Sequence, residues 1–253
     1  GKLANLFVLS DLSCCICAVL FSYLVHTRNL TMPSLEELLR THSGRDGIIR
    51  TLGYACLLSS GLTKGSLSKK FGILSSEFSH CRVISRLLDD WPMLTYSMSY
   101  GLGTQEQDYV LRILGVLKNI ADQVFYPVEH VTWLAKKQII NIQTDSWEAA
   151  GTILWAFSLY CGIARSLRTI NIIQKKREKL YGLSDDVCRK ESDALMKEQL
   201  GHALGILRNV ADFVNAISWL PGSFLWAGKL KAWHNGLLGL SSSLLSLACQ
   251  AIL

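Results

Sequence analysis

Proline is scarce in this sequence, and that scarcity constrains its fold more than any other feature. The 253 residues contain only four prolines, at positions 33, 92, 127 and 221. Because proline is the residue that most strongly interrupts a helix, long helices are permitted almost everywhere. Strict apolar–polar alternation is rare, whereas apolar residues recur at three- and four-residue steps, the spacing of one helix face. The sequence therefore predicts an all-α protein.

Composition leaves two classes of helical protein open. Hydrophobic residues make up 49% of the chain, which excludes a disordered protein. Charged residues make up only 18%, below the roughly 25% of typical soluble domains. The net charge of +6 is small, and no stripe of Lys and Arg with interleaved aromatic residues is present, so we expect no nucleic-acid binding. The chain is either a soluble helical bundle or a membrane protein, and the distribution of apolar residues must decide.

Residues 1–31 form a segment that we expect to be an N-terminal extension outside the functional protein. Leu6 to Val25 is a mostly apolar run interrupted by Asp11. Its length also suits a membrane span or the core of a signal peptide, so a genuine anchor is the alternative. A new helix-like segment begins directly afterwards, at Pro33.

An apolar stripe with basic neighbours runs through residues 67–88. The stripe alone favours a helix packed in a bundle, and a helix lying in a membrane interface is the alternative. The stripe consists of Leu67, Phe71, Leu74, Phe78, Cys81, Ile84 and Leu88. The basic residues beside or behind it are Lys69, Lys70, Arg82 and Arg86.

Residues 114–124 and 204–214 form an internal repeat. Seven of the eleven positions are identical, and three more exchange Val with Ile or Lys with Arg. On a helical wheel the apolar residues of each copy share one arc, and the polar residues lie opposite, so both copies are predicted to be amphipathic helices. We expect the polar residues to form a hydrogen-bonding rim or an ion pair such as Lys118–Asp122. These polar residues are Lys118, Asn119 and Asp122 in the first copy and Arg208, Asn209 and Asp212 in the second.

An uncharged segment follows each copy of the repeat. Ala149 to Ala164 and Gly236 to Leu253 contain no charged side chain. Both are short for a membrane span, which needs about 20 residues, and we predict membrane-embedded helices at 147–170 and 232–253. Each carries small residues four positions apart, a spacing that lets helices approach closely in lipid. These predicted helix-packing residues are Ser158, Gly162, Ser166, Gly239 and Ser243.

The chain is thereby divided into two weakly repeated halves. One membrane helix per repeat places the two amphipathic helices on opposite faces of the bilayer, as in an inverted repeat. Under the positive-inside rule, the basic residues between the halves would face the cytosol. The predicted organisation is an amphipathic helical region at 32–146, the first membrane helix, a charged loop at 171–200, a second amphipathic region at 201–231, and the second membrane helix.

Local signals predict some helix boundaries, and none of them predicts catalysis. Asp46 is suited to cap a helix, Thr104–Gln107 is close to a capping box, and Pro127 is expected to end the helix that follows. Nucleotide-binding, metalloprotease and serine-hydrolase motifs are absent from the sequence. We therefore expect a protein that is not an enzyme, with no catalytic residue, cofactor or metal site.

Several motifs resemble the peroxisomal membrane protein 11 family, and its gamma subtype in particular. The resemblance runs from about Met32 to about Leu247 and leaves out residues 1–31. The motifs that carry it are Gly44–Asp46, Ile49–Tyr54, Ser79–Arg82, Leu87–Asp90, Tyr100–Gly103, Asn119–Gln123, Tyr126–Val131, Leu154–Ala156, Ala164–Leu167, Trp219–Pro221 and Leu225–Gly228.

The resemblance implies an integral, multi-pass protein of the peroxisomal membrane that elongates and tubulates peroxisomes before they divide. The implied partners are anionic membrane lipids, further copies of the chain, other subtypes of the family, the tail-anchored fission adaptor and the dynamin-like GTPase. Both termini would face the cytosol, in place of the orientation that the positive-inside rule suggests.

The resemblance also favours a membrane interface for residues 67–88, where the family's remodelling helix falls by alignment. Phe71, Leu74 and Phe78 would wedge into the outer leaflet, and the four basic residues would lie at anionic headgroups. Two alternatives remain. Arg165 and Arg168, beside the first membrane helix, would suit a metabolite pore, and a plain helical scaffold would only bind partners.

Overall fold

The computed structural model describes residues 35–180, 186–222 and 224–252, and every regular element in these ranges is a helix. The prediction of an all-α protein is confirmed over this part of the chain. The extension predicted at residues 1–31 lies outside the described residues. The helices are α2 (Leu35–Arg40), α3 (His42–Leu62), α4 (Gly65–Arg86), α5 (Asp90–Tyr100), α6 (Tyr109–Lys136), α7 (Thr144–Leu180), α8 (Asp186–Trp219) and α9 (Ala232–Ile252).

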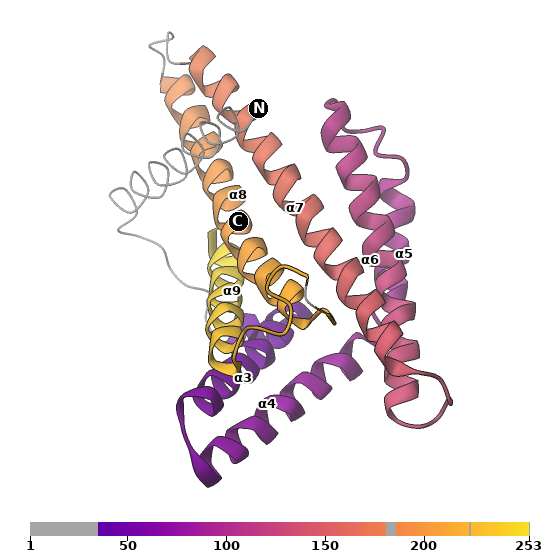
Figure 1. Cartoon of the computed structure of the whole chain (residues 1–253). Coiled ribbons are helices and arrows are strands. Elements are labelled where there is room, and N and C mark those ends of the chain that lie inside the picture. Colours follow the sequence, from indigo (N-terminus) through magenta and orange to yellow (C-terminus); the bar gives the residue numbers. More distant parts are fainter. Residues whose placement is uncertain (1–34, 181–185, 223, 253) are drawn as a thin grey trace.

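Six of these helices are arranged as a ring (Figure 1). Extensive contacts join α6 to α7, α7 to α8, α8 to α9, α9 to α3, and α3 to α4. Helix α4 then extends away from α3 and reaches α6 through only a few contacts, which closes the ring. Helix α5 lies outside the ring, along α6. The ring has one weak junction, where α4 meets α6.

The best-packed core lies between α7 and α8. Small residues allow these helices to approach closely, and Trp155 of α7 stacks on Trp219 of α8 with ring centroids 5.6 Å apart. The buried members of the two core clusters are Ala156, Ala216 and Ile217 in one, and Ile170, Ala203 and Ile206 in the other.

Helices α3 and α9 approach so closely that glycine is required at their contact. A Cβ atom at Gly61 would lie 2.5 Å from the backbone nitrogen of Trp233. A Cβ atom at Gly236 would lie 2.6 Å from the Cα of Leu58. Real Cβ atoms essentially never come this close to backbone atoms, so any other residue at either position would push the two helices apart.

Two helix boundaries differ from the predictions because other residues provide the caps. The Thr41 side chain accepts a hydrogen bond from Gly44 at 3.0 Å, so α3 begins before Asp46. Asp108 accepts hydrogen bonds from the backbone nitrogens of Val110 and Leu111, both at 3.0 Å, so α6 begins after the capping box predicted at 104–107. Both predictions were wrong in position.

Helix α6 also continues through Pro127, where an end was predicted. Its last turns bury Val128, Thr132 and Ala135, and Val128 lies near Gly151 of α7. Packing against α7 therefore outweighs the local cost of proline, as tertiary contacts commonly do for helices.

Helices replace most of the loop predicted at residues 171–200. Helix α7 runs to Leu180, and α8 begins at Asp186. Lys, Arg and Glu are good helix formers, and buried Ile173 and Leu200 continue the contact between the two helices. Arg177 adds a hydrogen bond of 2.9 Å to Gln199. The loop that the high charge of this region predicts is therefore wrong over most of its length.

The two predicted membrane helices match the structure differently. One is part of a longer helix, and the other is almost a whole helix. Residues 147–170 form the middle of α7, which is 37 residues long. Residues 232–253 nearly coincide with α9. Within the described ranges, no helix combines the length and the apolar character that crossing a bilayer requires.

Candidate functional site

The two copies of the repeat lie on α6 and α8 and direct their polar residues into the protein. Asn119 of α6 is only 8% exposed, and the equivalent Asn209 of α8 is 9% exposed. The neighbouring Ile120 is 56% exposed and Val210 is 43% exposed. This is the reverse of a soluble bundle, in which the apolar face of a helix packs inward.

Both polar faces converge on α7. A Cβ atom at Gly162 would lie 2.9 Å from Nδ2 of Asn209 and 4.0 Å from Cε of Lys118. Gly162 therefore sits between the two copies and allows both to pack against one helix. Lys118 also forms the predicted ion pair with Asp122, one turn along α6.

In the second copy, the aspartate forms its ion pair with α3 instead. Nη2 of Arg50 donates to Oδ1 of Asp212 at 2.5 Å and to Oγ of Ser242 at 3.1 Å. Burial disfavours the charged guanidinium, but the charge and hydrogen bond of Asp212, together with Tyr54, outweigh burial and raise the pKa of Arg50. The Arg50 guanidinium also lies 5.5 Å from the centre of the Tyr54 ring, and burial raises the pKa of Tyr54.

A set of large apolar side chains is exposed on the outside of the ring. Solvent-exposed apolar surface of this extent marks a contact with a membrane or another protein. An apolar groove of about 510 Å³ lies among them, between α7 and the end of α8. The exposed residues include Ile113, Leu117, Ile120 and Val124 of α6, Ile153, Phe157 and Tyr160 of α7, Leu207 and Val210 of α8, and Leu237 and Leu244 of α9.

Helix α4 exposes a different face from the predicted wedge. Phe71 and Phe78 are half-buried, and Phe78 lies against Gly53 of α3. Leu74 is exposed, as predicted for a membrane contact, and so are Lys69 and Lys70. The other large apolar residues that α4 exposes are Leu67, Ile73 and Ile84.

The other two predicted headgroup contacts, Arg82 and Arg86, form ion pairs inside the protein. Arg82 holds Asp46 of α3 through Nε at 2.8 Å and Nη2 at 3.0 Å. Arg86 holds Glu129 of α6 through the same two atoms, with Nε at 3.0 Å. Burial opposes the charge of Asp46, but Arg82, with smaller effects from Arg86 and Arg50, holds the pKa of that carboxyl below its usual range.

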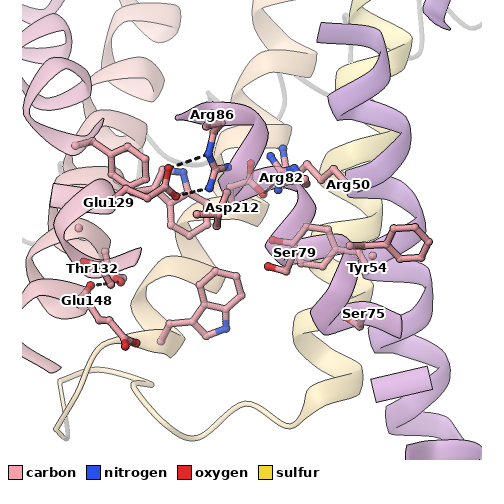
Figure 2. A pocket seen from close by; sticks show the side chains of 18 of the residues that line it. Arg50, Tyr54, Ser75, Ser79, Arg82, Arg86, Glu129, Thr132, Glu148 and Asp212 are labelled. Atoms are coloured by element: carbon pink, nitrogen blue, oxygen red, sulfur yellow. Dashed lines mark hydrogen bonds and ion pairs between the residues drawn. The ribbon is translucent and has the colours of Figure 1, made fainter. Parts of the chain in front are cut away.

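A cavity of about 450 Å³, lined by charged and apolar side chains, lies inside the ring between α3, α4, α6, α7 and α8 (Figure 2). Arg50, Arg82 and Arg86 line it together with Glu129 and Asp212. Sequence patterns do not predict this cavity, because the closure of α4 onto α6 joins residues 43 positions apart. The only available signal was the spacing of Arg82 and Arg86, which places both on one face of a helix.

The predicted helix-packing residues are largely buried. Ser158, Gly162 and Ser243 are buried, and Ser166 is half-buried. Buried Gly239 lies so close to the Tyr54 ring that a Cβ atom there would overlap it. Close approach of these residues within lipid stays a prediction.

The arginines that suggested a pore are also ion-paired. Arg165 pairs with Glu106. Arg168 pairs with Asp108 at 2.7 Å, and its hydrogen bond lowers the pKa of Asp108. These pairs join α7 to the segment just before α6.

The sequence was compared with protein families and with known proteins. The model of the family described as peroxisomal biogenesis factor 11 (PEX11) matches residues 32–251. Peroxisomal membrane protein 11C of Homo sapiens is 38% identical over 224 residues, which cover 86% of this chain and 93% of that protein. The protein of the same name in Mus musculus is 37% identical over 225 residues, with the same coverage. No solved structure matches the chain.

Proposed function

Because the chain belongs to the peroxisomal biogenesis factor 11 family, we propose that it elongates, tubulates and helps to divide peroxisomes by inserting apolar helix faces into their membrane. The family is one of peroxisomal membrane proteins that act in peroxisome biogenesis. The proposal adds a physical mechanism and contains no catalytic step.

The observation that carries this proposal is the reversed polarity of the repeat helices. Polar residues such as Asn209 and Asp212 are buried against neighbouring helices, whereas Leu117, Ile120 and Val210 face outward. Such an arrangement is costly in water, because it exposes apolar surface and buries polar groups. It costs far less where lipid covers the outside.

Helix α4 provides the part of this surface that can act as a wedge. Ile73, Leu74 and Ile84 are exposed, with Lys69 and Lys70 beside them. A helix of this kind lies in the membrane plane with its apolar side chains about 5–10 Å deep and its lysines at anionic headgroups. Insertion into one leaflet expands that leaflet relative to the other and favours a curved membrane.

Topology and partners form part of the same proposal. We place residues 147–170 of α7 and residues 232–252 of α9 in the membrane as two short embedded segments, with both termini in the cytosol. Protease protection of tags at each end, on intact peroxisomes, tests this placement. Further copies of the chain, other subtypes, the tail-anchored fission adaptor and the dynamin-like GTPase are the proposed protein partners.

The decisive experiment measures tubulation of anionic liposomes by the full-length chain, using electron microscopy. Ile73→Glu with Ile84→Glu should abolish tubulation, since each charge enters the exposed apolar face of α4. Ser76→Glu is the matched control, because Ser76 is exposed on the same helix but lies outside that face. Equal tubulation by the double variant and the control would refute the wedge.

The same vesicles discriminate between the alternative functions. A metabolite pore would release an entrapped solute without deforming the vesicle. A scaffold would capture the fission adaptor and leave vesicle shape unchanged. Tubulation that depends on Ile73 and Ile84 is expected only if the helix itself shapes the membrane.

A further inference from the structure

We propose that the cavity inside the ring binds one zwitterionic glycerophospholipid headgroup, with its phosphate at the arginines and its ammonium group at Glu148 and the tryptophans. The inference rests on the proposed membrane location, but it concerns a different surface from the α4 wedge. The cavity volume of about 450 Å³ falls within the roughly 300–1,000 Å³ of ordinary ligand sites.

The phosphate end of the site is formed by three guanidinium groups. Arg50 comes from α3, Arg82 and Arg86 come from α4, and all three line the cavity. Figure 2 shows them grouped at one end, apart from Glu148. The bonds to Asp46 and Glu129 use Nε and Nη2 of Arg82 and Arg86, so Nη1 of each lies outside these pairs. Planar guanidinium groups with free N–H donors suit the oxygens of a phosphodiester.

The part of the cavity lining that includes Glu148 suits a positively charged amine. Trp155 and Trp219 stack on each other and both line the cavity, as does Glu148. An ammonium group is attracted to the face of an indole ring and to a carboxylate. Glu148 pairs with Lys136 at 3.0 Å, but both side chains are about half exposed. Such an exposed pair stabilises little, so the carboxylate can turn to a ligand at low cost.

The charge balance favours a zwitterion over an anion. Four ion pairs surround the cavity: Arg50–Asp212, Arg82–Asp46, Arg86–Glu129 and Lys136–Glu148. Their charges cancel, so the site gains little from a ligand of net charge. Within this balance, the three guanidinium groups lie at one end of the cavity and the Glu148 carboxylate lies apart from them (Figure 2), which matches a ligand whose own two charges are separated. This distinguishes the cavity from the surface of α4, where Lys69 and Lys70 favour anionic lipid.

The test is a binding titration of the full-length chain in detergent with dihexanoyl phosphatidylcholine below its micelle concentration, followed by calorimetry. We expect one molecule per chain, bound about tenfold more tightly than dihexanoyl phosphatidylglycerol. Inorganic phosphate and choline chloride are titrated separately to identify which part of the lipid is recognised. Equal binding of inorganic phosphate would mean a simple anion site, and no binding of the phosphatidylcholine would mean an empty cavity; either result overturns the proposal.

Two variants test the location of the site. Arg82→Gln should weaken binding about tenfold, since it removes a charged donor to the phosphate. Ser79→Trp keeps every ion pair and fills the cavity from α4, so it should abolish binding even if Arg82→Gln fails to fold. Arg168→Gln breaks a similar ion pair, with Asp108, outside the cavity, and should bind normally.

Unchanged binding by the Ser79→Trp variant would overturn the assignment to this cavity. The headgroup-binding test and the tubulation test of the α4 wedge can fail independently. Failure of headgroup binding with intact liposome tubulation rejects only the cavity site, whereas loss of tubulation with intact binding affects only the proposed function.

Discussion

The two copies of the repeat share a polar pattern, yet their equivalent aspartates have different partners. In the first copy, Asp122 pairs with Lys118 of its own helix, and both side chains are partly exposed. In the second copy, Asp212 is 4% exposed and pairs with Arg50, 162 positions away on α3. One aspartate stabilises a helix locally, and the other joins three helices through Arg50 and Ser242 of α9.

The difference follows from where each helix lies in the ring. Helix α6 is at one end of the well-packed part, next to the weak junction with α4. Helix α8 lies between α7 and α9, and α9 in turn packs against α3 (Figure 1). The repeated sequence therefore specifies the same helix twice, and the surrounding helices decide whether its charges serve that helix or the whole fold.

The largest expected effect separates the two aspartates. Asp212→Ala leaves the buried guanidinium of Arg50 without its carboxylate, which should lower the free energy of unfolding by about 3–5 kcal/mol. Asp122→Ala removes only a partly exposed pair within one helix and should cost about 0.5 kcal/mol. Unfolding of each variant in the same detergent, followed by circular dichroism, measures both values. Equal losses would show that the ring does not depend on Asp212.

The second prediction concerns the glycine that both copies carry. A Cβ atom at Gly115 would overlap the Tyr100 hydroxyl and lie 2.7 Å from Nη1 of Arg165, whereas one at Gly205 would meet nothing within 4 Å. Gly115→Ala should therefore destabilise by about 1–3 kcal/mol through overpacking. Gly205→Ala should stabilise by about 0.5–1 kcal/mol, because alanine is the better helix former.

The sign of the change is the informative readout for this pair. Thermal unfolding midpoints should move in opposite directions for the two alanine variants. A shift in the same direction for both would contradict the different surroundings of Gly115 and Gly205.

Local sequence signals predicted the helices and their arcs, but they did not predict which way the arcs face. The spacing of Lys118 and Asp122 was sufficient to predict their ion pair, because both residues lie on one helix. The same spacing cannot show that Asn119 faces inward and Ile120 outward. The direction depends on the medium and the helices around α6, which the spacing does not reveal. Water outside a helix favours an exposed polar side, whereas lipid outside it favours an exposed apolar side.

Long-range packing accounts for the remaining errors. Pro127 and the charged residues 171–200 are local signals for a helix end and a loop. Both are overridden by packing along α7, whose partners are distant in sequence. The cavity inside the ring could not be predicted for the same reason, because Arg86 and Glu129 meet only when α4 closes the ring.

The third prediction compares the paired asparagines. Nδ2 of Asn119 is buried and has no hydrogen-bond partner, whereas Oδ1 of Asn209 accepts from Arg208. An unpaired buried amide costs about 1–3 kcal/mol, so Asn119→Leu should leave stability unchanged or raise it. Asn209→Leu should lower stability by about 1 kcal/mol, because it leaves the Arg208 donors without that acceptor. Chemical unfolding of both variants, compared at equal temperature, tests the asymmetry, and a larger loss for Asn119→Leu would contradict it.

The smallest expected effect is a pH dependence of the helix that carries the second copy. Position 202, just before that copy, is histidine, and the corresponding position before the first copy is Arg112. Burial lowers the pKa of His202, with a smaller opposing effect from the charge of Glu198. The folded chain therefore keeps this imidazole neutral to a lower pH than the unfolded chain, which protonates it near the ordinary value of about 6.5.

Stability should accordingly be complete above about pH 6.5 and decline as the pH falls below that value. His202→Gln should remove this part of the pH profile, because glutamine does not titrate. Arg112→Gln should leave the profile unchanged, since its guanidinium stays charged throughout this range. Thermal unfolding midpoints measured between pH 5 and pH 8 give the result. A profile that persists in the His202→Gln variant would place the titrating group elsewhere and remove this difference between the two copies.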